Sequence, residues 1–244
     1  MIVQDVMTTK LVTVEPDDTL AHAANLLRQY QFHHLPVARK TTTAPQKADS
    51  SKRQAALQFE GVLTSHDIDL AAWEGEGNKD HLAQQPWQER RVVEVMHRAA
   101  MQVTPTTSVA AAAQMLVERG LNYLPVIEYH QGERENKPLL VGFLTRSDLL
   151  MALSRAMGTF EPGMQLDVAL PMGNMAALAR ILVLASELRM PIRSIMAAPL
   201  SGNVPHVATI RLGTINPAPL LKRLQEEGIQ FSFGSSLAEG DVYV

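Results

Sequence analysis

The stretch His34-Leu35-Pro36-Val37 recurs 89 residues later (123 − 34) as Tyr123-Leu124-Pro125-Val126. Two further segments recur at the same distance and in the same order, Asp5-Val6-Met7 as Glu94-Val95-Met96 and Val14-Glu15-Pro16 as Val103-Thr104-Pro105. Self-similarity at a fixed spacing indicates a duplicated supersecondary unit. Most of the first two thirds of the chain is therefore predicted to be one unit, present twice.

Apolar residues between these segments follow the spacing of a helix face. Leu20, Ala23, Ala24 and Leu27 stand at i, i+3, i+4 and i+7, and Val109, Ala112, Ala113 and Leu116 repeat them. Each unit is predicted to run strand, helix, strand, strand, helix. In the first unit these are residues 11–14, 20–30, 34–38 and 59–63, with the last helix starting near 65.

The end of the repeat has a shorter spacing. Gly61-Val62-Leu63-Thr64, followed by Asp67, aligns with Gly142-Phe143-Leu144-Thr145, followed by Asp148, at a distance of 81 (142 − 61). The first copy is therefore longer by eight residues (89 − 81). The extra residues fall within 39–58, a stretch rich in Lys, Thr, Ser, Ala and Gln that is predicted to be an exposed loop.

These motifs, twice in order, resemble a pair of cystathionine β-synthase (CBS) domains over roughly residues 1–157. The resemblance implies a first domain at 1–73, a linker at 74–90 and a second domain at 91–157. It also implies that clefts between two sheets bind an adenosine-containing regulatory ligand, such as AMP, ADP or ATP. Pairs of this family usually dimerise and pass a signal to an attached domain.

Each copy has a Thr-x-x-Asp motif where an apolar strand is followed by a helix. The pattern is that of a capping box, worth about 1 kcal/mol to the helix. A carboxylate there also suits the hydroxyls of a ribose, as in dinucleotide-binding folds. By resemblance, the second copy contributes Thr145, Ser147 and Asp148 to a nucleotide site, and the first copy contributes Thr64, His66 and Asp67. Because His66 stands where the second copy has Ser147, the second site follows the family pattern more closely.

Other nucleotide-binding candidates come from the segments before the Leu-Pro-Val strands and from the turns after the first motif. They are His33, His34, Asn122, Tyr123, Thr9, Lys10 and Arg98. Lysine and arginine at such turns are equally typical of solvated surface. No metal site is expected at His33 and His34, because neighbouring residues on a strand point to opposite faces.

The last third of the chain reads as strand 165–170, helix 175–189, strands within 191–199 and 206–212, helix 217–227 and strand 229–233. The order βαββαβ is that of a ferredoxin-like sandwich. After a CBS pair, residues 164–236 resemble an ACT domain, and the three-part chain resembles the acetoin-utilisation AcuB group. Gly173 and Asn174 are candidates for an ACT ligand loop, or they form a plain turn in which Asn174 caps the helix.

Composition narrows the function classes. The 244 residues carry a formal net charge of -3 and no cysteine, which disfavours nucleic-acid binding and excludes thiolate metal sites and cysteine nucleophiles. The N-terminus lacks the pattern of a signal peptide and no apolar run is long enough to span a bilayer, so a cytoplasmic protein is expected. The leading hypothesis is an α/β (α+β) non-enzymatic sensor, homodimeric through its CBS and ACT-like domains, that regulates an unidentified protein. An enzyme or accessory subunit of acetoin utilisation, or a dimerisation module with vestigial sites, is the alternative.

Overall fold

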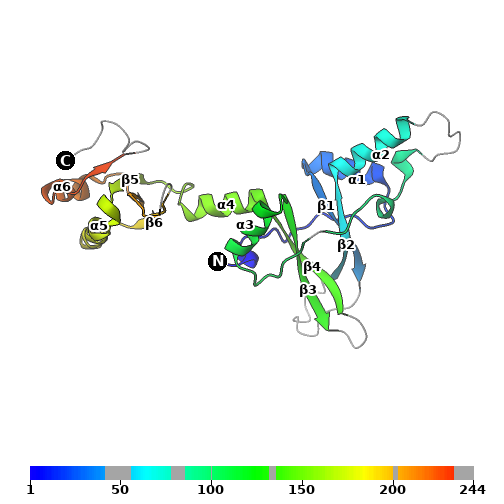
Figure 1. Cartoon of the computed structure of the whole chain (residues 1–244), viewed down its shortest axis with the longest axis horizontal. Helices are drawn as coiled ribbons and strands as arrows, with labels where there is room; N and C mark the ends of the chain where they lie inside the picture. Colours follow the sequence, from blue (N-terminus) through cyan, green and yellow to red (C-terminus); the bar gives the residue numbers. More distant parts are fainter. Residues whose placement is uncertain (42–55, 78–85, 100, 132–135, 200–202, 234–244) are drawn as a thin grey trace. The chain divides into compact units, whose positions relative to one another are not determined.

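The computed structural model describes residues 1–41, 56–77, 86–99, 101–131, 136–199 and 203–233 (Figure 1). The chain forms two compact units, Met1–Leu149 and Leu150–Val244. Within the described residues, no helix combines the length and the apolar character needed to cross a membrane.

The first unit consists of two copies of a helix, a hairpin and a second helix. The first copy contains α1 (Leu20–Tyr30), β1 (His34–Thr41), β2 (Ala56–Thr64) and α2 (Ser65–Gly77). The second copy contains α3 (Val109–Glu118), β3 (Tyr123–Gln131), β4 (Asn136–Thr145) and α4 (Arg146–Ala156), whose end belongs to the second unit. Short 3-10 turns, η1 (Val3–Asp5), η2 (Trp87–Glu89) and η3 (Val92–Glu94), lie between these elements.

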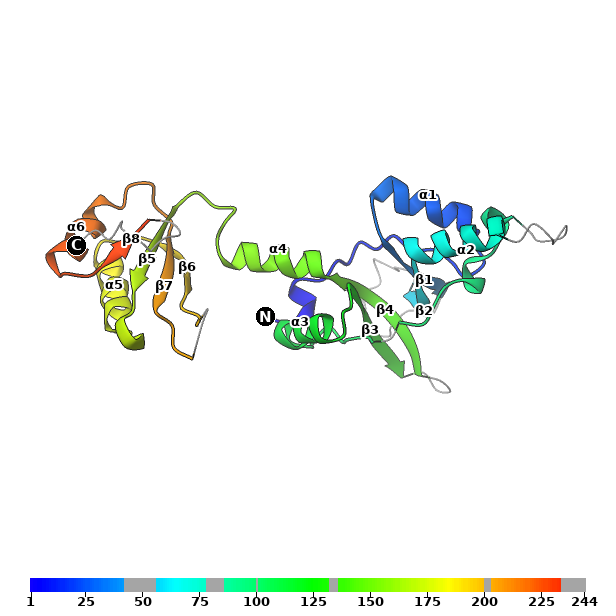
Figure 2. The same cartoon turned by 45° about the horizontal axis from the view of Figure 1, so that its top comes forward.

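The two hairpins form one sheet, in the order β1-β2-β4-β3. A single residue pairing, Gln58 with Leu139, joins β2 to β4. The family resemblance implied two separate sheets, whereas here the two hairpins are joined into one sheet at this point. The duplication extends to the irregularities, because both hairpins shift register at the equivalent places, after Val37 and after Val126. Figure 2 shows α1 and α2 beside the first hairpin.

Two local predictions need correction. Residues 11–14 are not a strand, since only Val14 forms a bridge, to Val37, and Pro16 follows soon after. The predicted loop 39–58 is shorter than expected, because β1 continues to Thr41 and β2 starts at Ala56. The rest of that loop lies outside the described residues. Helix α2 follows β2 directly and runs from Ser65 to Gly77.

The opening segment of each copy is built into the other copy. Thr8 pairs with Phe143 of the second copy, and His97 pairs with Val62 of the first. The cores show the same exchange, because Val3 packs in the core of the second copy and Val92 in that of the first. Each copy therefore completes its core with its twin, which places the opening turns at the edge of the opposite copy's last strand.

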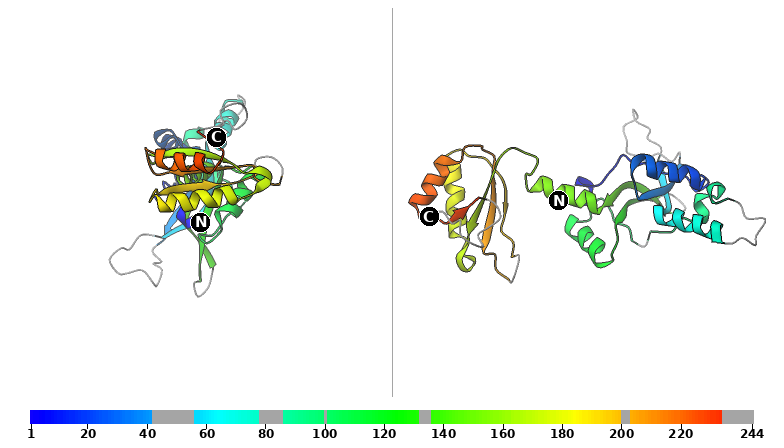
Figure 3. Two further views of the ribbon diagram at one scale, coloured as in Figure 1. Left: turned by 90° about the vertical axis from the view of Figure 1, so that its left-hand side faces the viewer. Right: turned by 90° about the horizontal axis from the view of Figure 1, so that it is seen from above.

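The second unit contains β5 (Met164–Ala169), α5 (Ala176–Glu187), β6 (Ile192–Met196), β7 (Val207–Leu212), α6 (Ala218–Glu226) and β8 (Phe231–Ser232). The predicted βαββαβ order is confirmed, and the sheet is antiparallel with the order β6-β7-β5-β8. Both helices lie on one face of this sheet (Figure 3), where Ile181, Leu184, Leu220 and Leu224 are fully buried. The last strand is shorter than the predicted 229–233.

Candidate functional site

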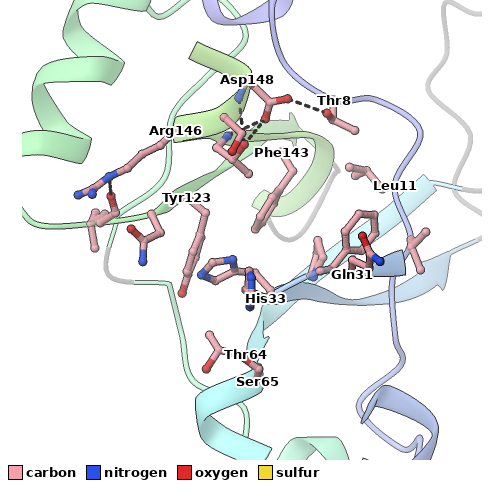
Figure 4. A pocket seen from close by; sticks show the side chains of 18 of the residues that line it. Thr8, Leu11, Gln31, His33, Thr64, Ser65, Tyr123, Phe143, Arg146 and Asp148 are labelled. Carbon is pink, nitrogen blue, oxygen red and sulfur yellow. Dashed lines mark hydrogen bonds between the residues drawn. The ribbon is translucent and has the colours of Figure 1, made fainter. Parts of the chain in front are cut away.

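A cavity of about 860 Å³ lies between the two copies in the first unit (Figure 4). Ten of the predicted nucleotide-binding residues line it: Lys10, His33, His34, Thr64, His66, Asn122, Tyr123, Thr145, Ser147 and Asp148. These residues lie far apart along the chain. They meet because the opening segment of each copy packs against the other copy. The structure therefore brings most of the candidates together at one place.

Three candidates do not line this cavity: Thr9, Asp67 and Arg98. Conversely, several lining residues were absent from the sequence-based candidates, namely Thr8, Leu11, Val12, Pro36, Ser65, Phe143 and Arg146. Gln31, Phe32, Gly120 and Leu121 also line the cavity and belong to the segments before the Leu-Pro-Val strands, which the family resemblance assigned to the cleft. Most of these lie beside predicted residues in the same segments. Phe143 and Leu11 were not foreseeable from the repeat motif, because they reach the cavity through pairing of the opening segment with the far copy.

Asp148 sits at the first turn of α4 and is held by reciprocal capping bonds. Its Oδ2 accepts from the backbone N–H of Thr145 at 2.8 Å and from the Thr145 hydroxyl at 2.7 Å. The Asp148 N–H donates to the Thr145 hydroxyl in return, at 3.1 Å. Its other oxygen, Oδ1, accepts from the Thr8 hydroxyl at 3.2 Å. Capping thus uses one carboxylate oxygen and turns the other toward Thr8 at the cavity, as Figure 4 shows.

Asp67 makes the same cap at the start of α2. Its Oδ2 accepts from the N–H and the hydroxyl of Thr64, at 2.8 and 2.7 Å. The same oxygen lies 3.3 Å from Nδ1 of His97, which stands where the other copy has Thr8. The two aspartates are therefore equivalent as caps and different in their surroundings.

Aromatic rings form one wall of the cavity. The Tyr123 ring stacks on Phe143 with centroids 5.4 Å apart and lies 4.5 Å from the His34 ring (Figure 4). Burial, helped by the charge of Asp67, raises the pKa of Tyr123 to about 12, so its hydroxyl is protonated at neutral pH. Burial is also the main cause that lowers the pKa of His34, which favours its uncharged ring.

Cationic groups and helix starts face the same space. Among the described lining residues Asp148 is the one carboxylate, whereas Lys10, Arg146, His33, His34 and His66 are basic. Helices α2 and α4 both begin at the cavity, with Ser65 and Arg146 as their first residues. Free amides at a helix start attract anions. Arg146 itself is tied back, because its guanidinium donates to the carbonyls of Leu121 and Leu116 at 2.7 and 3.2 Å.

His33 and His34 both line the cavity, so the expectation that they diverge to opposite faces is wrong. The reason is that β1 begins only at His34, which leaves His33 in the preceding turn. In the described part of the chain, no group of three or more His, Cys, Asp or Glu side chains is arranged to hold a metal ion.

The loop with Gly173 and Asn174 is a compact turn in the second unit. Gly173 has φ +75°, and a Cβ there would collide with the Val204 side chain. The Asn174 side chain accepts from the N–H of Ala176 at 2.9 Å, but Met175 and not Asn174 is the residue that directly precedes α5, so the predicted N-cap is one residue too early. These contacts account for both residues as a turn, and a ligand role for them stays a prediction.

Comparison with known proteins supports the family of the first unit. The model of the CBS domain matches residues 3–43 and 92–155. The CBS domain-containing protein YhcV of Bacillus subtilis is 27% identical over 147 residues, which cover 60% of this chain and 81% of that protein.

Solved structures similar to part of the chain include two of comparable identity. The structure of a Vibrio cholerae protein assigned to acetoin utilization (AcuB) is 25% identical, covering 66% of this chain and 98% of that one, with a TM-score of 0.45. The structure of CBSX2, solved in complex with AMP, is 24% identical, covering 62% of this chain and 95% of that one, with a TM-score of 0.43. The family model ends at residue 155, so the antiparallel sheet and the two helices of the second unit lie outside it. Both copies of the duplicated first unit thus contain residues that match the CBS domain model.

Proposed function

We propose that this chain is a non-enzymatic regulatory protein that binds an adenosine-containing ligand in the cavity beside Asp148. The proposal rests on the contacts of the Asp148 carboxylate. Its Oδ2 is used by the helix cap, whereas its Oδ1 contacts only the Thr8 hydroxyl among its hydrogen bonds in the described residues. An ionised carboxylate oxygen accepts more than one hydrogen bond, so a ribose diol can donate to it without breaking the cap.

The rest of the cavity suits the other parts of such a ligand. Apolar and aromatic side chains, including Leu11, Phe32 and Phe143, offer a surface for a purine ring. Lys10 and the starts of α2 and α4 offer a favourable place for phosphate, to which imidazole N–H groups can also donate. A volume of about 860 Å³ lies within the range of small-ligand pockets.

The proposal also assigns a role to the second unit, as an ACT-like domain that dimerises and carries the signal onward. The CBS pair is proposed to dimerise as well. The resemblance of the three-part chain to the acetoin-utilisation group makes carbon metabolism the proposed setting, in the cytoplasm. Such coupling requires that the ligand bind one arrangement of the protein better than another.

Thermal denaturation in the presence of AMP, ADP, ATP, S-adenosylmethionine, NADH and free amino acids tests the ligand class. A ligand at 100 times its dissociation constant adds about 2.7 kcal/mol to the free energy of unfolding. AMP, the ligand of the CBSX2 structure, is the first probe. If none of the adenosine compounds raises the melting temperature, the proposed function is wrong.

Two matched variants locate the site. Asp148→Asn removes the charge that would receive the ribose, and we expect calorimetry to show AMP binding weakened roughly 10-fold to 100-fold. Asp67→Asn makes the same change in the equivalent cap of α2, outside the cavity, and should leave AMP affinity as in the wild type. Equal affinity of the Asp148→Asn variant and the wild type would exclude this carboxylate as the ribose contact.

A further inference from the structure

Thr8 and His97 are equivalent residues of the two copies, 89 positions apart (97 − 8). Each pairs its backbone with the last strand of the opposite copy. Thr8 exchanges bonds of 2.9 and 3.0 Å with Phe143, and His97 exchanges bonds of 2.9 and 3.1 Å with Val62. The backbone therefore presents both side chains in the same way to the aspartate that caps the following helix.

The two side chains differ in what they do there. Thr8 makes one short contact, from its hydroxyl to Oδ1 of Asp148 at 3.2 Å. His97 bridges two groups, with Nδ1 3.3 Å from Oδ2 of Asp67 and Nε2 2.8 Å from the hydroxyl of Tyr123. The imidazole thus spans from the aspartate of the first copy to a ring of the second copy, where the other position has only a hydroxyl and a methyl group.

Both ring nitrogens of His97 have a polar neighbour in this bridge. An ionised carboxylate is an acceptor only, so the nitrogen that faces Asp67 carries the proton. In the uncharged ring Nε2 is then an acceptor, and the Tyr123 hydroxyl donates to it. That hydroxyl keeps its proton at neutral pH, because its pKa is raised to about 12.

These contacts gather on one oxygen of Asp67. Its Oδ2 accepts two bonds from Thr64 and lies beside His97, and its side chain is 19% exposed. A ribose diol that approached Asp67 in the way proposed for Asp148 would meet the His97 imidazole, which is hydrogen-bonded to Tyr123 through Nε2 and lies 3.3 Å from Oδ2 through Nδ1. Neither Asp67 nor His97 lines the cavity.

Resting on the proposed function, we infer that the chain binds one nucleotide, at Asp148, and that His97 closes the equivalent position at Asp67. The two halves of the duplication have thereby taken different tasks. The second copy's aspartate is left for a ligand, and the first copy's aspartate holds the two copies together through His97 and Tyr123.

Isothermal titration calorimetry of the full chain with AMP tests this inference through the number of sites. We expect one AMP per wild-type chain. His97→Thr, which copies Thr8 into the first position, should raise the number to two. Thr8→His, which copies His97 into the second position, should weaken AMP binding at least about 10-fold, the equivalent of about 1.4 kcal/mol. His97→Ala serves as a second opening variant if His97→Thr does not give a folded protein by thermal denaturation.

The outcomes separate this inference from the proposed function. Two AMP per wild-type chain, or one per chain in both folded His97 variants, would overturn the closure by His97 while nucleotide binding stands. Unchanged AMP affinity in folded Thr8→His would overturn the inference that an imidazole at this position excludes the ligand. If the wild type binds no adenosine compound, the proposed function fails first, and the inference with it.

Discussion

Gln31 and Gly120 end equivalent helices in the same left-handed backbone conformation, with φ +55° and +62°. After each of them, the next residue's N–H bonds back to the helix at 2.9 Å, Phe32 to Leu27 and Leu121 to Leu116. This backbone bonding is typical of a helix end that favours glycine. The cap is therefore kept in the first copy although glutamine pays a steric penalty for it.

That penalty leads to a paired prediction. Gln31→Gly should raise the free energy of unfolding of the ligand-free protein by about 0.5–1 kcal/mol, because glycine adopts a positive φ without strain. Gly120→Ala should lower it by about 1 kcal/mol through backbone strain alone, since no atom lies within 4 Å of the added Cβ. Urea denaturation of both variants measures the difference. A destabilised Gln31→Gly variant would mean that the glutamine side chain contributes more than its backbone costs.

The sequence could anticipate this conformation at Gly120 but not at Gln31, because glycine adopts a positive φ readily and glutamine does not. A different limit, set by distance along the chain, applies to the site. The capping motif at Thr145 and Asp148 is contiguous, so its pattern was visible. The contact from Thr8 to Asp148 joins residues 140 positions apart, and only the folded chain reveals it.

At the scale of elements, the close approach of the opening turns to the last strands depends on two glycines. A Cβ on Gly61 of β2 would lie 2.7 Å from the backbone carbonyl of His97. A Cβ on Gly142 of β4 would meet the flexible side chain of Met7 instead. The first clash cannot be relieved without moving the turn that pairs with Val62, whereas the second can be relieved by a change of rotamer.

We therefore expect Gly61→Ala to lower the free energy of unfolding by about 1–3 kcal/mol and Gly142→Ala by about 1 kcal/mol or less. Chemical denaturation compares the two variants directly, and each is the control for the other. Equal losses, or a larger loss in Gly142→Ala, would show that the turn at His97 yields more easily than its paired backbone suggests.

Elements with a strong local pattern were the ones that the sequence predicted well. Helix α1 occupies the predicted residues 20–30, because its apolar spacing and its cap, in which Thr19 accepts from the N–H of His22 at 3.2 Å, are both local. The predicted strand 11–14 failed for the opposite reason. Its apolar residues suggested a strand, but a strand needs a partner along its length, and only Val14 has one.

At the scale of the whole molecule, the chain divides into two compact units, and the cavity belongs entirely to the first. A regulatory role requires that ligand occupancy in the first unit change the free energy of some state of the second. A module with vestigial sites would lack that coupling, even if it still bound a nucleotide. The two hypotheses therefore differ in what happens within residues 150–244 when the cavity is filled.

Hydrogen exchange of the full chain, read by mass spectrometry with and without AMP, separates these hypotheses. Peptides that line the cavity, around Thr8 and around Asp148, should exchange more slowly with AMP, because binding lowers the population of open states. If the protein is a sensor, peptides within 150–244 should also change their rates, and Asp148→Asn should abolish both effects at the same AMP concentration. Protection confined to the first unit would contradict the sensor and leave a nucleotide-binding module without output. Changes in the second unit that persist in Asp148→Asn would instead place AMP at a different site, because the coupling would then not run through this carboxylate.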